Sequence, residues 1–265
     1  MPDKLIIFDY SGTLSLEMAV FARPDNLMKH LKSSGLFALG LHSKALFWEI
    51  IKATWTEGST TGLGYKKVML ARLEELFPEI TSSRKTETAK AVAGFVDAYL
   101  DNSRIDEHWR LILKKLSLDK SVRVIIATDH YAEATQAIIK NLAKWDIQAM
   151  PLMADAESNI MVANSADMGI HKAQQQFWQM LKDILRQNYH NILLIDDFGQ
   201  NEQQKDDYGE PMKVIERRQM TVKILRKVFA ADVESISFVC KDEEIKGLIA
   251  ETSVKIDQFL LCCGR

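Results

Sequence analysis

Hydrophobic positions along the chain follow two patterns. Short runs rich in apolar residues, each too short for a helix, lie at residues 5–8, 122–127, 147–153, 191–195 and 235–240. Such runs are typical of strands that are buried on both faces of a parallel sheet. A further apolar segment, residues 159–163, is expected to form part of a short hairpin. Apolar positions at helical spacing separate the runs. The alternation predicts an α/β fold with a doubly wound parallel sheet.

One long region carries only the helical pattern. Residues 17–116 contain several apolar stripes with helical spacing and no convincing parallel strand. We therefore expect an inserted helical domain at 17–116, and an α/β core made of residues 1–16 and 117–265. Residues 57–64 (EGSTTGLG) are expected to link two inserted helices. The polar segment 199–210 is expected to be a mobile loop.

Composition excludes several classes of function. The 265 residues carry a net charge of -2 with 47% hydrophobic and 26% charged residues, so nothing favours binding to nucleic acid or to a membrane surface. Cys240, Cys262 and Cys263 have neither disulfide-framework nor metal-site spacing, and the final CCGR fits a prenylation motif poorly. No secretory signal and no run of about 18 apolar residues is present. We expect a cytoplasmic protein.

Reactive side chains stand at the ends of the predicted strands. Asp9 follows the first strand, Thr128 ends the second, and Asp196 and Asp197 end the fourth, while Lys172 opens a predicted helix. Because the carboxyl ends of parallel strands share one edge of the sheet, these groups are expected to converge. Carboxylates, a hydroxyl and a lysine are the groups that phosphoryl transfer through an aspartyl-phosphate requires, together with a divalent ion.

The same set, in this order, resembles the haloacid dehalogenase (HAD) superfamily of hydrolases. Residues 9–13 (DYSGT) look like its first motif, DxDGT, and VRVIIAT with Thr128 looks like the second. Lys172 is similar to the third motif, and the DD pair to the fourth. The helical region lies where the family inserts a C1-type cap. The resemblance implies a Rossmann-like sheet of order 5-4-1-2-3 with an all-helical cap.

The resemblance also implies roles for individual residues. Asp9 would be the nucleophile and a Mg²⁺ ligand, and Asp196 a second ligand. Asp197 would bind the ion through water or orient its neighbours, and the backbone carbonyl of Ser11 would complete the protein ligands. Asn201 is a further candidate that would assist metal binding.

Substrate binding is expected at the same place. Thr128 and Lys172 would hold the phosphoryl group of a small phosphorylated metabolite, and Lys172 would also reduce repulsion between Asp9 and the acidic pair. In C1-capped relatives a glycine-containing loop of the cap enters the site, and residues 57–64 have the composition and position for that loop.

Ser11 departs from the pattern of the family. Phosphatases of this family usually carry at that position an Asp that protonates the leaving group and then activates water, and such acid–base catalysis is worth ~10²–10⁴-fold in rate. Hydrolysis would then be slow, the phosphoenzyme would be long-lived, or another group would supply the acid or base. Candidates for that group are Glu17, His42, Glu57 and His130.

The departure leaves three functions open. A Mg²⁺-dependent phosphohydrolase is favoured, because the other motif residues are present. The alternative is a HAD-fold phosphate-binding or regulatory protein with little turnover. A haloacid dehalogenase is less favoured, because those enzymes need no metal whereas Asp196 and Asp197 resemble a metal-binding pair.

Overall fold

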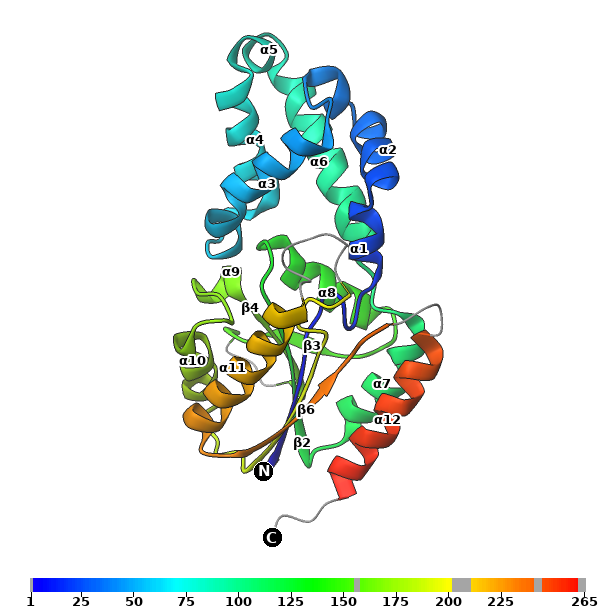
Figure 1. Ribbon diagram of the computed structural model, residues 1–265, viewed down its shortest axis with the longest axis vertical. Coiled ribbons are helices and arrows are strands. Elements are labelled where there is room, and N and C mark those ends of the chain that lie inside the picture. The colour runs from blue at the N-terminus through cyan, green and yellow to red at the C-terminus, as the bar shows by residue number, and fades with distance from the viewer. Residues whose placement is uncertain (1, 155–157, 202–210, 241–244, 262–265) are drawn as a thin grey trace.

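A parallel sheet of six strands lies at the centre of the computed structural model, which describes residues 2–154, 158–201, 211–240 and 245–261 (Figure 1). The strand order is β3-β4-β2-β1-β5-β6, and all neighbouring strands pair in parallel. The strands are β1 Lys4–Phe8, β2 Val122–Thr128, β3 Ala149–Pro151, β4 Ile160–Asn164, β5 Asn191–Asp196 and β6 Asp232–Ser237. The expected doubly wound α/β fold is confirmed, with one strand more than the expected five.

The added strand corrects the expectation for residues 159–163. These residues do not form a hairpin, because β4 lies between β2 and β3 and pairs in parallel with both. All five residues of β4 are buried. A strand that is buried along its whole length fits the interior of a parallel sheet, whereas a hairpin exposed on one face would alternate.

Helices cover both faces of the sheet. Ile6 and Phe8 of β1 belong to one hydrophobic cluster, which includes side chains of α7, α8 and α12. Leu5 and Ile7 belong to the other, with side chains of α10 and α11. This alternation explains why every residue of β1 is buried. These helices are α7 Arg110–Leu118, α8 Glu133–Ala143, α10 Gln175–Leu185, α11 Pro211–Phe229 and α12 Ile245–Leu261, and the short α9 Ser165–Met168 follows β4.

A separate group of helices, residues 17–102, extends from one end of the sheet (Figure 1). Its apolar side chains form a third cluster. We call this group the helical insertion. It consists of α1 Glu17–Ala22, α2 Pro24–Ser34, η1 Leu36–Leu39, α3 Lys44–Ser59, α4 Gly64–Leu76, α5 Pro78–Ser83 and α6 Lys85–Asn102.

The helix that follows the insertion packs with the core. Trp109 of η2 Glu107–Trp109 and Leu113 and Leu116 of α7 lie in a hydrophobic cluster of the sheet. The division at 17–116 stays a prediction, and this packing favours a boundary between α6 and η2.

Two expectations fall mainly outside the described residues: the loop at 199–210, of which 202–210 are not described, and the Cys262–Cys263 tail. None of the helices in the described part of the chain has the length and apolar character that crossing a membrane requires.

Candidate active site

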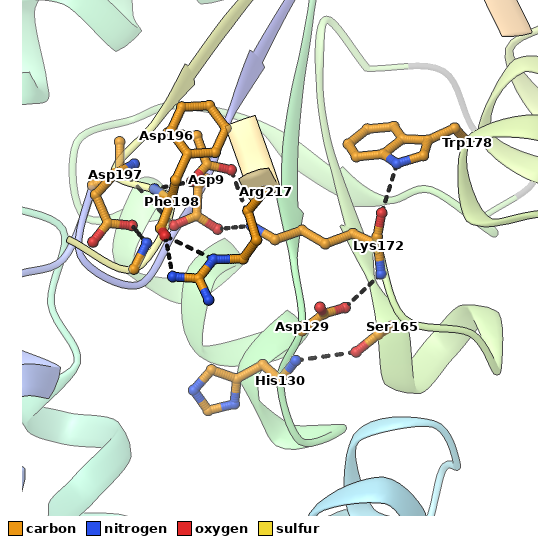
Figure 2. Close-up of polar contacts among 12 residues, drawn as sticks. Asp9, Asp129, His130, Ser165, Lys172, Trp178, Asp196, Asp197, Phe198 and Arg217 are labelled. Atoms are coloured by element: carbon orange, nitrogen blue, oxygen red, sulfur yellow. Dashed lines mark hydrogen bonds and ion pairs between the residues drawn. The ribbon is translucent and has the colours of Figure 1, made fainter. Parts of the chain in front are cut away.

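Three carboxylates meet at the carboxyl ends of β1 and β5. Phe8 pairs with Ile195, so the residues that follow, Asp9 and Asp196, lie side by side. Oxygens of Asp9, Asp196 and Asp197 come within 4.8 Å of one another, and all three side chains are buried (Figure 2). The predicted convergence of these residues is therefore present in the structure.

Lys172 provides a positive charge to this cluster. Its ammonium group donates a hydrogen bond to Asp9 Oδ1 and lies 3.3 Å from Asp196 Oδ2. Its backbone N–H donates to Asp129 Oδ1 at 2.8 Å, and the Trp178 indole donates to its carbonyl at 2.7 Å (Figure 2). The sequence pattern predicted that Lys172 opens a helix, and this prediction is wrong. Lys172 lies in the turn before α10, which begins at Gln175.

The turn after β1 fits closely against the acidic pair. Gly12 has φ +80, and a Cβ there would lie 2.4 Å from Asp197 Oδ2, so both conformation and space favour glycine. Thr13 Oγ1 accepts a hydrogen bond from the Asp197 N–H at 3.0 Å and lies 3.5 Å from Asp9 Oδ2. The Gly-Thr pair therefore joins the nucleophile candidate to the acidic pair.

The turn after β5 holds both of its carboxylates through backbone N–H groups. Phe198 N–H donates to Asp196 Oδ1 at 2.6 Å. Gly199 and Asn201 donate their N–H groups to the two oxygens of Asp197, at 3.0 and 2.9 Å. These bonds orient the carboxylates that the metal would need.

Asn201 uses its side-chain amide to join backbone segments. Its Nδ2 donates to the carbonyls of Gly12 and Phe238 at 2.6 and 2.7 Å, and its Oδ1 accepts from the Cys240 N–H at 2.8 Å. The amide thus holds three segments together.

Burial and mutual repulsion dominate the electrostatics. Burial raises the pKa of the Asp9 carboxyl well above its ordinary value, Lys172 opposes this shift, and the charges of Asp196 and Asp197 add to it. The described ion pairs give this cluster of three buried carboxylates one positive charge, that of Lys172. An all-oxygen donor set with this charge fits a hard divalent cation such as Mg²⁺.

Ser11 lies in the tight turn that follows β1, two residues after Asp9. The Gly12 N–H donates to the Ser15 carbonyl and the Ser15 N–H to the Tyr10 carbonyl, both at 2.8 Å. Neither bond uses the carbonyl of Ser11.

Thr128 is the last residue of β2 and is 1% exposed. Its hydroxyl has no hydrogen-bond partner among the described residues. Buried hydroxyls are normally paired, so an unpaired one at a strand end favours contact with a ligand.

The four acid–base candidates differ in exposure. Glu17, His42 and Glu57 are exposed on the helical insertion. His130 is buried: its Nδ1 accepts from the Tyr131 N–H at 2.8 Å, its Nε2 lies 3.1 Å from the Tyr99 hydroxyl, and burial lowers its pKa to about 4. His130 is therefore a neutral structural histidine.

The helical insertion meets the core at a set of residues of which only Ser59 lies in the expected 57–64 link. His171 Nε2 lies 2.7 Å from Ser59 Oγ, and its ring stacks on Trp55. Tyr131 stacks on Tyr65 with the ring centroids 4.1 Å apart. Glu133 accepts from the N–H groups of Tyr65 and Lys66 at 2.7 and 3.2 Å. We call the set the docking contact: Trp55, Ser59 and Tyr65 of the insertion with Tyr131, Glu133 and His171 of the core.

The bounds of α3 and α4 correct the expected 57–64 link. Helix α3 continues to Ser59, so residues 60–63 alone connect it to α4. Ser59 contacts His171, the neighbour of Lys172, so the end of α3 lies against the segment that carries Lys172. Sequence spacing carries no signal for such pairs, because their members are far apart in the chain.

Comparison with known proteins identifies the fold. No protein-family model matches the chain, and no curated protein matches it in sequence. A 2-haloacid dehalogenase from Pseudomonas syringae pv. Tomato has a similar structure, with a TM-score of 0.55 and 14% identity, covering 97% of this chain and 100% of that chain. A HAD-family enzyme from Bacteroides thetaiotaomicron has a TM-score of 0.52 and 12% identity, covering 94% of this chain and 98% of that chain. Likeness at such low identity shows the fold alone. The chain has the fold of the haloacid dehalogenase superfamily.

Proposed function

We propose that the protein is a Mg²⁺-dependent phosphohydrolase that acts on a small phosphorylated metabolite through an aspartyl-phosphate at Asp9. The observation that carries this proposal is the cluster of three buried carboxylates with one lysine at the ends of β1 and β5. Isolated buried charges are costly unless they are compensated, so the three buried carboxylates favour a bound cation.

The metal would be held by Asp9, Asp196 and the carbonyl of Ser11, with Asp197 binding through water or orienting the others. When bound, Mg²⁺ supplies positive charge that attracts the phosphoryl oxygens and offsets their repulsion from the carboxylates. The backbone N–H groups that hold Asp196 and Asp197 keep their oxygens in place before the ion arrives.

The remaining residues act on the substrate. A carboxylate oxygen of Asp9 forms a bond to phosphorus while the bond from phosphorus to the leaving oxygen breaks. Lys172 pairs with Asp9, which favours the charged form of that carboxyl against the effect of burial, and with the Thr128 hydroxyl it holds phosphoryl oxygens. Water then attacks phosphorus and releases phosphate from Asp9.

Ser11 favours a second candidate function. A serine hydroxyl does not exchange protons near neutral pH as a carboxyl does, and the neutral, buried His130 does not replace it. The alternative is a protein that binds phosphate and Mg²⁺ with little turnover. A metal-free haloacid dehalogenase is less favoured, because a cluster of three buried carboxylates that pairs with Lys172 is a donor set that suits a divalent cation.

A phosphate-release screen with Mg²⁺ tests the proposal. We expect the wild type to hydrolyse at least one ester, and Asp9→Asn or a chelator to abolish this activity. Asp97→Asn, which removes a half-exposed carboxylate on α6, is the matched control and is expected to leave activity unchanged.

Ser11→Asp separates the two candidates. An inert wild type with an active Ser11→Asp variant would establish the binding protein. Activity that survives both Asp9→Asn and the chelator would exclude the proposed mechanism.

A further inference from the structure

Helix α11 places the side chain of Arg217 against the turn after β5. We call this turn, residues 196–201, the acidic turn. The Arg217 guanidinium donates from Nε and Nη2 to one acceptor, the carbonyl oxygen of Phe198, at 2.9 and 2.6 Å (Figure 2). Phe198 directly follows the acidic pair. Arg217 thus binds the backbone beside the candidate metal ligands, and its own side chain has no oxygen that could bind the metal.

Phe198 connects the hydrogen bonds from Arg217 to the carboxylates. The N–H of Phe198 holds Asp196 Oδ1 at 2.6 Å. Phe198 has φ +54, a left-handed conformation that a bulky residue rarely adopts. Surrounding contacts must maintain that conformation, and the two bonds from Arg217 act directly on it.

The turn then continues to the second carboxylate. Gly199, also at positive φ, and Asn201 donate their N–H groups to Asp197. A shift of the Phe198 carbonyl would therefore move the N–H groups that orient Asp196 on one side and Asp197 on the other.

We propose that Arg217 is a positioning residue for the metal centre: by holding the Phe198 carbonyl, it fixes the turn that presents Asp196 and Asp197 to the cation. This inference rests on the proposed function, because it assumes that the carboxylates bind Mg²⁺. The competing view is that Arg217 only fastens α11 to the core.

The chain offers a matched control for that competing view. Arg218, the next residue of α11, donates from Nε to Ser235 Oγ at 3.1 Å and from Nη2 to the Ser235 carbonyl at 3.3 Å. It fastens the same helix to β6 through the same chemistry. Substitution of Arg218 removes helix attachment without touching the acidic turn.

The experiment measures Mg²⁺ affinity by titration calorimetry on purified, metal-depleted full-length protein. We expect R217Q to weaken Mg²⁺ binding by ~10–100-fold, the range found when outer partners of metal ligands are removed. R218Q is expected to bind as the wild type does. R217K is expected to lie between wild type and R217Q, because its ammonium reaches the carbonyl but lacks the two-pronged geometry.

A second measurement does not depend on the metal. Amide hydrogen exchange in the metal-free protein is expected to speed up at Phe198, Gly199 and Asn201 in R217Q, and to stay unchanged there in R218Q. This reports on the turn even if R217Q loses some stability.

The outcomes separate the two proposals. Wild-type affinity and wild-type exchange in R217Q would overturn the positioning role, as would equal weakening in R217Q and R218Q. A wild-type protein that binds no Mg²⁺ and releases no phosphate would instead overturn the proposed function, and the inference with it.

Discussion

At the scale of single residues, the candidate site combines satisfied and unsatisfied polar groups. Thr13 and Asp197 are buried, and backbone or side-chain partners occupy their polar atoms. The Thr128 hydroxyl is equally buried and has no such partner in the described part of the chain. A buried donor left unpaired costs about 1–3 kcal/mol, so the protein carries that cost unless a ligand accepts the bond.

This contrast predicts opposite effects of Thr128→Val on stability and activity. Valine has nearly the same shape and no hydroxyl, so the free energy of unfolding is expected to stay equal or rise. The kcat/KM for a phosphate ester is expected to fall by ~10–100-fold, the worth of one hydrogen bond to a charged group. Thr128→Ser, which keeps the hydroxyl, should retain most of the activity. Equal losses in both variants would mean that the hydroxyl contacts no substrate.

His130 predicts how stability depends on pH. Burial lowers its folded pKa from 6.5 to about 4, so between these values the unfolded state binds more protons than the folded one. Its contribution to the free energy of unfolding is complete above pH 6.5 and is lost as the pH falls towards 4, by about 3 kcal/mol in total. The rings of Tyr10, Tyr99 and Tyr131 surround it.

Urea denaturation at pH 7 and pH 4.5 checks this. His130→Asn keeps an acceptor near the position of Nδ1 and removes the titration, so it should lose less stability between the two pH values than the wild type does. The exposed His42→Asn should behave as the wild type. A wild type and a His130→Asn variant with the same pH dependence would contradict the assignment.

At the scale of secondary-structure elements, the start of α4 depends on a residue from another part of the chain. Gly64 begins the helix with φ +79, and a Cβ there would lie 2.6 Å from a carboxylate oxygen of Glu133. That carboxylate accepts the free N–H groups of the first turn, where a negative charge also favours the helix dipole.

Alanine at two glycines should therefore have opposite effects. Gly64→Ala is expected to lower the free energy of unfolding by about 1–3 kcal/mol, through backbone strain and displacement of Glu133. Gly94→Ala, in the exposed interior of α6 with nothing within 4 Å of the added Cβ, is expected to raise it by about 0.5–1 kcal/mol. Chemical denaturation of the three proteins measures both differences, and a neutral Gly64→Ala would show that Glu133 does not depend on this close approach.

The sequence predicted those elements whose pattern is local. The buried runs that became β1, β2 and β5 were located to within a residue or two, because a parallel strand covered on both faces is apolar along its whole length. The same property misled the interpretation of β4. A continuous apolar run does not specify its partner, and only the spatial path of the chain puts β4 beside β2.

The residues of the candidate site likewise divide into those that the local sequence predicts and those that it does not. Asp9, Thr128, Asp196 and Asp197 were predictable, because each stands directly at a strand end. Arg217 was not, since its role depends on where α11 lies relative to the acidic turn. His171 and Glu133 were missed for the same reason.

At the scale of the whole molecule, the docking contact joins the helical insertion to the two segments that carry Thr128 and Lys172. Tyr131 and Glu133 come shortly after Thr128, and His171 immediately precedes Lys172. The position of the insertion is thereby tied to the groups proposed to hold phosphate. We propose that the insertion covers the site and selects the substrate by the residues it places there.

Substitutions at two glycines near the end of α3 distinguish substrate selection by the insertion from its attachment to the core. A Cβ on Gly58 would lie 2.4 Å from the Tyr131 ring, which is buried and stacked on Tyr65, whereas Gly62 has nothing within 4 Å. Gly62→Leu should leave the free energy of unfolding unchanged and alter the ratio of kcat/KM values across a panel of phosphate esters, because the side chain enters open space between α3 and α4. Gly58→Ala should push the docking contact apart and lower kcat/KM for every ester by a similar factor. If Gly62→Leu keeps the wild-type ratios across the panel, residues 60–63 do not contact the substrate, and selection must come from another part of the insertion.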